Sequence, residues 1–160
     1  MPTSAMTALA TITLGSAQST VTFSSISGAY RDLMLVVNAT NTASATNLRM
    51  TINSDSGANY PYVVMEGDGA SAVSASSTAL TYMLVGVSQT TATMQRIQIM
   101  DYSATDKHKS ILSRSDYPGG ATNAIAARWT NTSAITNLVV FPGASSFAAG
   151  STFTLYGVSA

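Results

Sequence analysis

Apolar and polar residues alternate with a period of two along most of this chain. Leu48, Met50 and Ile52, for example, are separated by the polar residues Arg49 and Thr51. The 3.6-residue periodicity of an amphipathic helix is nearly absent. Successive side chains of a strand point to opposite faces, so a period of two is typical of strands with one buried face. The pattern therefore predicts an all-β protein.

The alternating segments predict about ten strands with roughly 10–14 residues between starts, a spacing typical of sandwiches and barrels. They lie at residues 7–14, 21–23, 33–39, 48–52, 60–66, 80–87, 94–101, 109–115, 124–130, 135–141 and 152–159. Residues 53–59 and 116–120 are turns by composition, because Asn, Asp and Ser bond their own backbone and Gly supplies positive φ. We expect one domain over residues 1–160, an antiparallel β-sandwich of the jelly-roll type.

Three segments depart from simple alternation. The strand at 33–39 is also apolar at Met34 and Val36, which predicts burial on both faces. Pro61 cannot donate to a strand ladder, so it favours a sheet edge or the start of a strand. Residues 67–78 are almost all Gly, Ala and Ser, so we expect them to form a long surface loop or to be ordered by a partner.

The composition is poor in charge. Charged residues are 9% of the chain, against about 25% in ordinary soluble domains, while hydrophobic residues are 46%. Recurrent β-branched and aromatic residues argue against disorder. A formal net charge of zero argues against a nucleic-acid binder or a basic membrane-surface module, since both use a basic field. A surface with so few charges is prone to self-association, so we expect a homo-oligomer whose neighbours cover much of it.

The sequence also limits the site of synthesis and the stabilising chemistry. It has no cysteine, which excludes disulfides and thiolate metal sites. The first basic residue is Arg31, so the positive region of a signal peptide is missing, and no apolar run is long enough to span a membrane. We expect a protein made in the cytoplasm and then assembled.

Candidate catalytic chemistry is sparse. His108 is the single histidine, and with Asp106, Lys107 and Lys109 it reads as a charged hairpin tip. A catalytic histidine needs a nucleophile and an orienting acid, and the sequence nominates neither. Zinc is disfavoured because only carboxylates accompany this histidine. We therefore expect no catalytic, cofactor or metal site.

Two weaker motifs have simpler explanations. Residues 67–72 match a loose dinucleotide pattern, but no amphipathic helix follows to hold a pyrophosphate. Asp55 with its neighbouring asparagines, or Glu66 with Asp68, could bind calcium. The EF-hand spacing is absent, and turn chemistry explains both clusters better.

The charges are concentrated in one part of the chain. Half of the fourteen charged side chains lie between Arg96 and Asp116. Either this region is simply the most solvent-exposed, or it docks on a charged partner. For the second case the candidate contact residues are Arg96, Asp106, Lys107, His108, Lys109 and Arg114.

Aromatic residues could instead form a sugar-binding face. The candidates are Tyr60, Tyr62, Tyr82, Tyr102, Tyr117 and Trp129. Aromatic residues at alternating strand positions are more often core or interface anchors. Trp129 shares a face with Ile125 and Ala127, so we expect it in the core.

Three segments resemble small β-sandwich structural proteins of tailed-bacteriophage virions. They are GSTFTLYGV at 150–158, FSSISGAYRDLMLVVNA at 23–39 and LRMTINSDSGANY at 48–60. In that group a strand, a Ser/Gly/Tyr turn, an Asp-Leu pair, a long apolar strand and an Asn-Ser-Asp-Ser-Gly hairpin follow one another. These residues are architectural, so the resemblance implies a particle component without giving its place on the particle.

The resemblance implies a non-enzymatic decoration (cement) protein, typically trimeric, seated on the major capsid protein or another virion protein and located in the virion. The alternative is a tail-fibre or tail-tip module that recognises host glycans. The short chain without fibrous repeats or an aromatic-rich loop favours cement. An enzyme such as a depolymerase would need paired carboxylates, and the seven acids are scattered.

Overall fold

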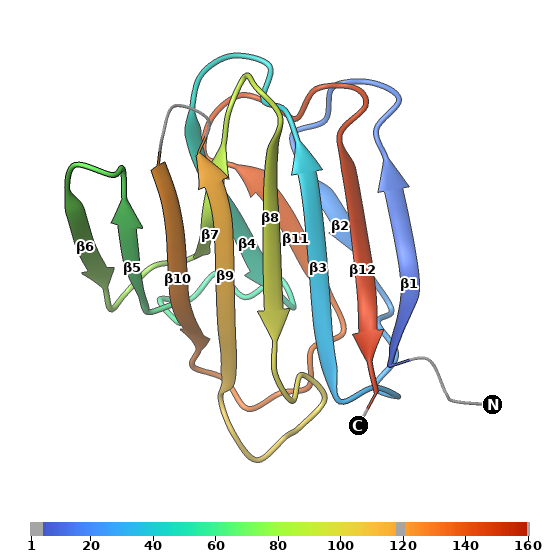
Figure 1. Cartoon of the computed structure of the whole chain (residues 1–160). Coiled ribbons are helices and arrows are strands. Elements are labelled where there is room, and N and C mark those ends of the chain that lie inside the picture. Colours follow the sequence, from blue (N-terminus) through green and yellow to red (C-terminus); the bar gives the residue numbers. More distant parts are fainter. Residues whose placement is uncertain (1–4, 118–120, 160) are drawn as a thin grey trace.

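Two antiparallel sheets packed face to face form this protein (Figure 1). The computed structural model describes residues 5–117 and 121–159, which form strands and no helix, and hence no helix able to cross a membrane. Within them the strands are β1 (Met6–Thr13), β2 (Val21–Phe23), β3 (Asp32–Ala39), β4 (Thr46–Ile52), β5 (Tyr62–Gly67), β6 (Ala72–Ser77), β7 (Met83–Ser88), β8 (Thr93–Ile99), β9 (Lys109–Tyr117), β10 (Ala121–Trp129), β11 (Leu138–Pro142) and β12 (Thr152–Val158). The predicted all-β antiparallel sandwich is confirmed.

The two sheets differ in width. The larger has eight strands in the order β1-β12-β3-β8-β9-β10-β5-β6, and the smaller has four in the order β2-β11-β4-β7. The chain crosses repeatedly from one sheet to the other, as in a jelly roll. The wide sheet has one face on the core. Its opposite face, called the outer face below, has no layer of the described residues over it (Figure 1).

Alternation selects the core as expected. Leu33, Leu35 and Val37 of β3 are fully buried between the sheets, as are Leu48 and Met50 of β4. Burying such side chains contributes about 1.5–3 kcal/mol each, so this layer dominates the stability. Trp129, Ile125 and Ala127 are also buried on one face of β10, as predicted.

The segment expected to be least structured contains a strand. Within 67–78, β6 pairs antiparallel with β5 along its whole length. Asp68 closes the hairpin, since its Oδ1 accepts the backbone N–H groups of Ala70 at 2.9 Å and Ser71 at 2.6 Å. The Ala/Ser composition has weak strand propensity, so pairing and turn chemistry decide the conformation here.

Smaller differences concern strand ends. Pro61 immediately precedes β5, which has neighbours on both sides, so Pro61 marks a strand start and no sheet edge. β7 begins only at Met83, and Ile135 is buried ahead of β11. Of the predicted turn at 116–120, the first two residues belong to β9 and residues 118–120 lie outside the described residues.

The hairpin of β5 and β6 extends beyond the smaller sheet. β7 is the last strand of that sheet and packs beneath β8, β9 and β10. Val63 and Met65 on one face of the hairpin and Val73 on the other are all exposed. Near its tip the hairpin therefore has solvent on both faces, whereas Tyr62 and Val64 of β5 pack against the core.

Candidate functional site

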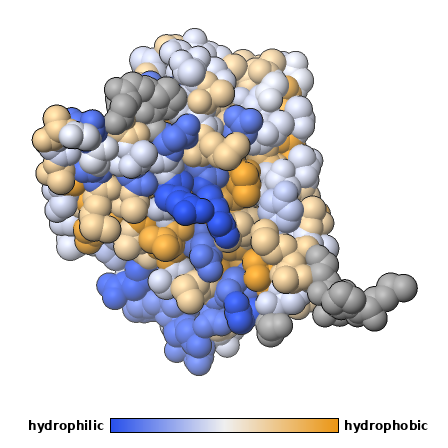
Figure 2. Space-filling model, viewed as in Figure 1, coloured by the Kyte–Doolittle hydropathy of each residue, from blue (hydrophilic) through white to orange (hydrophobic). Residues whose placement is uncertain are grey.

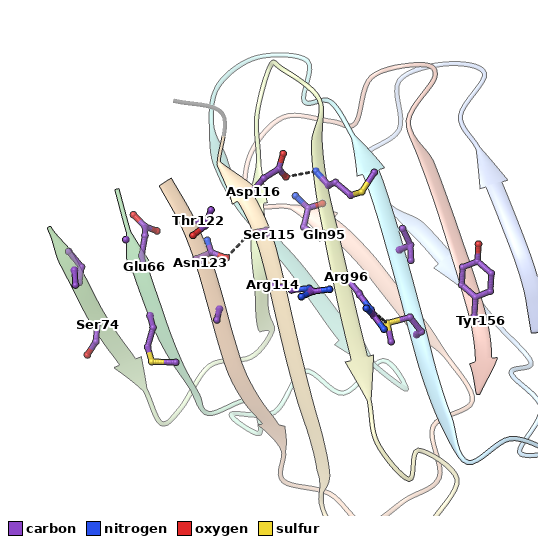
Figure 3. Close-up of a pocket in the computed structure, with 18 of the residues that line it drawn as sticks. Glu66, Ser74, Gln95, Arg96, Arg114, Ser115, Asp116, Thr122, Asn123 and Tyr156 are labelled. Carbon is purple, nitrogen blue, oxygen red and sulfur yellow. Dashed lines mark hydrogen bonds between the residues drawn. The ribbon is translucent and has the colours of Figure 1, made fainter. Parts of the chain in front are cut away.

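Two arginines lie side by side in the middle of the outer face. Arg96 of β8 and Arg114 of β9 are direct cross-strand partners. Their sequence neighbours Gln95, Ile97 and Ser113 are buried, so the alternation of the strands turns both arginines away from the core. Figure 3 shows the two guanidinium groups extending from adjacent strands.

A row of residues in register crosses the sheet through this pair. Val36 of β3 is the partner of Arg96, and Arg114 is the partner of Ala124 of β10. Ala124 is in turn the partner of Met65 of β5. Apolar side chains thus flank the two charges on both sides along the row.

The outer face is hollowed around this row into a groove of about 1370 Å³. Figure 2 shows hydrophilic residues at the centre of this face with hydrophobic residues around them. The groove is lined mostly by apolar atoms and includes half of the eight methionines of the chain. Its larger apolar residues are Met6, Met34, Val36, Met65, Val73, Met94 and Tyr156.

Neither arginine has a carboxylate partner in the described part of the chain. Arg96 donates its Nε–H to the Sδ of Met34 at 3.1 Å, which is a weak acceptor. Among the ion pairs of residues 5–117 and 121–159, none involves Arg96 or Arg114. Asp116 is on the same face, but its Oδ1 accepts the backbone N–H of Met94 at 2.6 Å. The pair therefore presents two positive charges that form no ion pair within the described residues.

The predicted contact residues separate into three groups. Arg96 and Arg114 come together in the groove. Asp106, Lys107 and His108 are exposed in the β8–β9 loop, at one end of the wide sheet and outside the groove lining (Figure 1). Lys107 forms ion pairs there, with Asp106 at 4.0 Å and Asp101 at 3.5 Å.

Lys109 is a correction to the sequence-based prediction, because it is fully buried and cannot touch a partner. Its Nζ donates to the backbone carbonyls of Ala104 at 2.7 Å, Lys107 at 2.9 Å and Thr132 at 3.1 Å. Burial lowers the pKa of this ammonium group below its ordinary value. Lys109 fastens the β8–β9 loop to the segment that follows β10.

Asp55 acts as a turn residue. Its carboxylate accepts hydrogen bonds from the Gly57 N–H at 2.8 Å, the Asn59 side chain at 2.9 Å and the Trp129 indole at 2.7 Å. Burial raises the pKa of Asp55, but these hydrogen bonds outweigh that effect and lower it overall. Within the described residues, no three His, Cys, Asp or Glu side chains cluster in a way that could hold a metal.

The aromatic candidates do not gather on the outer face. Tyr60, Tyr102 and Trp129 are buried, and Tyr62 packs against the core. The hydroxyl of Tyr60 accepts the Ile52 N–H at 3.1 Å, and burial raises the pKa of Tyr60 to about 12. Tyr82 packs edge-on against Phe141 and beneath the Arg49 guanidinium. The side chain of Tyr117, the last candidate, is outside the described residues. Tyr156 of β12, which was not among these candidates, does line the groove.

The methionines of the groove were missed by sequence reasoning. Met65 and Met94 occupy outward positions of their strands and are 60% and 56% exposed. Large apolar residues at positions where alternation expects polar ones were the available signal.

Comparison with known proteins extends only to architecture. No protein-family model matches the sequence, and a search of curated proteins gives no significant match. A crystal structure of a galectin from Caenorhabditis elegans, LEC-6, is 12% identical, covers 94% of this chain and 96% of its own, and has a TM-score of 0.39. A structure of an alginate lyase, Aly36B, in complex with alginate tetrasaccharide is 11% identical, covers 92% and 77%, and has a TM-score of 0.35. The protein is similar to these structures in its sandwich fold alone.

Proposed function

We propose that this protein is a non-enzymatic structural component of a tailed-bacteriophage particle, a decoration protein that docks on the outside of the head. The sequence resemblance of residues 150–158, 23–39 and 48–60 to small virion sandwiches supports the particle assignment. The observation that carries the docking role is the uncovered apolar outer face.

An exposed apolar surface of this kind calls for a protein partner. Val63, Met65, Met94 and Leu112 all project from the outer face and are about half exposed or more. Contiguous apolar patches on soluble proteins mark interaction sites, since leaving them in water costs free energy. Methionine adapts its shape to a partner, which suits a surface that must fit several capsid subunits.

The proposed mechanism is adhesion. A protein seated across the junction of capsid subunits buries surface against each of them, so separating the subunits also requires breaking those contacts. The hydroxyl-rich remainder of the surface can satisfy hydrogen bonds without the desolvation penalty of buried charge. A homotrimer would present three such faces at once and multiply the effect through avidity.

The groove offers little support for catalysis. The carboxylates lining it are Glu66 and Asp116, and one Asp116 oxygen is occupied by the Met94 N–H. The sole histidine of the chain, His108, lies outside the groove lining. Glycosidases use two carboxyl groups about 5–9.5 Å apart, one on each side of the scissile bond. By strand register, Glu66 and Asp116 point to opposite faces of the wide sheet.

To test this proposal, purified protein is added to expanded phage heads that lack it, and the temperature at which the heads break open is measured. We expect binding and a rise of several degrees in the disruption temperature, with saturation at a fixed ratio to the major capsid protein. Analytical ultracentrifugation of the free protein tests the trimer. Binding without any rise in the disruption temperature rules out the cement role.

Glycan recognition at a tail tip is the second candidate, and Tyr156 in the groove is the observation that favours it. A sugar ring can stack on such a side chain, while arginines bind hydroxyl or acidic groups. A glycan array with clear hits that disappear in Tyr156→Ala would make this reading the leading one.

A further inference from the structure

We infer that the outer-face groove receives an acidic, apolar-flanked segment of a partner protein, and that Arg96 and Arg114 together bind one carboxylate of that segment. This inference rests on the proposed function only in taking the partner to be a protein. It adds the chemistry of the contact, the two residues that recognise it and the spacing of the partner's side chains.

In the free protein the two arginines repel each other electrostatically. Like charges on directly opposite residues of neighbouring strands repel each other, since such Cβ atoms are only about 5 Å apart. No acidic side chain of the described residues pairs with either guanidinium. A carboxylate placed between them would remove the repulsion and form charge-assisted hydrogen bonds with both.

The surroundings strengthen this interaction. Met34 lies against the Arg96 guanidinium, and Val36 and Ala124 flank the pair along the register row. Once a partner covers these apolar groups, water is excluded and the effective dielectric constant falls. The same charges on an open polar surface would be screened by salt and would contribute little.

The strand spacing matches an extended peptide. Neighbouring strands are about 4.8 Å apart, so Val36 and Ala124 each lie roughly 7 Å from the midpoint of the arginine pair. Residues two positions apart in an extended chain are separated by about 6.6 Å and point the same way. A segment lying across the strands can thus place Asp or Glu over the arginines and apolar residues over Val36 and Ala124.

The other anionic occupants fit less well. A nucleic acid would need a run of basic residues along its backbone, whereas the groove lining contains two arginines together with Glu66 and Asp116. An acyl chain is held best by a cleft or cavity that buries most of its surface, whereas this groove lies along the outside of a sheet (Figure 3). A peptide uses both the charge pair and the apolar flanks.

The test selects, from a displayed library of random peptides, those that bind the full-length protein. Peptides that also bind the Arg96→Gln/Arg114→Gln double variant are then removed. We expect the enriched peptides to carry Asp or Glu with apolar residues two positions to either side. A synthetic Leu-x-Glu-x-Leu peptide should bind the wild type about tenfold or more tighter than its Leu-x-Gln-x-Leu counterpart, and the double variant should lose this preference. Arg128→Gln, on the same face but in the row of Ser110, is the matched control and should keep it.

Several outcomes overturn the inference. One is enrichment of peptides without an acid, or equal binding by the double variant. Another is failure of all peptides while dodecanoate shifts the methionine methyl resonances, which would identify an anionic lipid. A fall in the melting temperature of the double variant would show that the arginines stabilise the fold and are not an unpaired site.

Peptide binding without stabilisation of heads would remove the decoration role and leave this inference standing.

Discussion

The indole Nε1–H of Trp129, at the end of β10, donates a hydrogen bond of 2.7 Å to Oδ2 of Asp55 in the turn after β4. This contact joins the wide sheet to the turn that follows a strand of the smaller sheet. Trp129 is buried, so its N–H needs a partner within the protein. The turn is therefore a structural element of the sandwich as well as a connection between strands.

We expect Asp55→Asn to lower the free energy of unfolding by about 1–3 kcal/mol at neutral pH, because an amide cannot accept all three donors that surround the carboxylate. Urea denaturation at pH 7 measures the change. Asp106→Asn, in the exposed β8–β9 loop, is the control and should change stability little.

The stability difference between the wild type and Asp55→Asn should depend on pH. The folded-state pKa of Asp55 lies below its ordinary value, so its contribution is present above the unfolded pKa of about 3.9 and is lost as the pH falls through the folded pKa. The stability difference between wild type and Asp55→Asn should shrink below about pH 4. A difference that persists unchanged to pH 2 would contradict the assignment.

Lys109→Met should destabilise the protein by about 2–4 kcal/mol, since it leaves three backbone carbonyls without their donor. The β8–β9 loop should loosen at the same time, and limited proteolysis within residues 100–108 reports this. Lys107→Met, in the same loop but with an exposed side chain, is the comparison and should leave both readouts near the wild type.

Gly157→Ala should destabilise the protein by about 1–3 kcal/mol, because the new methyl group would overlap the ring of Tyr30. Thermal unfolding measures the effect. In a Tyr30→Ala background the same substitution should cost much less, since the ring is gone and the two changes are coupled. Equal costs in both backgrounds would place the strain elsewhere.

Hydrogen exchange should separate the strands of the wide sheet. β6 has a neighbour on one side only and overhangs the smaller sheet, whereas β3 lies between β12 and β8 above the core. Local opening of β6 therefore costs less free energy, and its amides should exchange orders of magnitude faster than those of β3. Mass spectrometry of the free protein checks this, and comparable protection would show that β6 is covered by another copy.

Period-two alternation was sufficient to predict the sandwich and most of its strands. Buried Leu33, Leu48 and Trp129 all follow from it, since each occupies an inward position between polar neighbours or in an apolar run. β6 did not follow, because its Ala and Ser residues carry almost no pattern and its pairing partner is fixed only by the fold. Sheet order was equally inaccessible, since it depends on long-range pairing.

The candidate site was predicted in part. The charge cluster pointed to Arg96 and Arg114. The hairpin tip expected at 106–109 makes their strands neighbours, but the sequence did not give the register that makes the two arginines direct partners. Lys109 was taken for a surface charge because Asp106, Lys107 and His108 beside it are polar. Its burial follows from two carbonyls of the β8–β9 loop and the Thr132 carbonyl after β10, which only the tertiary structure brings to one point.

The Asp68 turn at the tip of the β5–β6 hairpin is the most promising place to insert a foreign peptide into this protein. The tip of the hairpin is remote from the fully buried side chains of β3 and β4, and Met65 and Val73 near the tip are exposed on opposite faces. Lengthening a surface loop costs little closure entropy. An epitope or tag placed between Asp68 and Ser71 would thus be displayed at the rim of the wide sheet, next to the hairpin residues that line the groove.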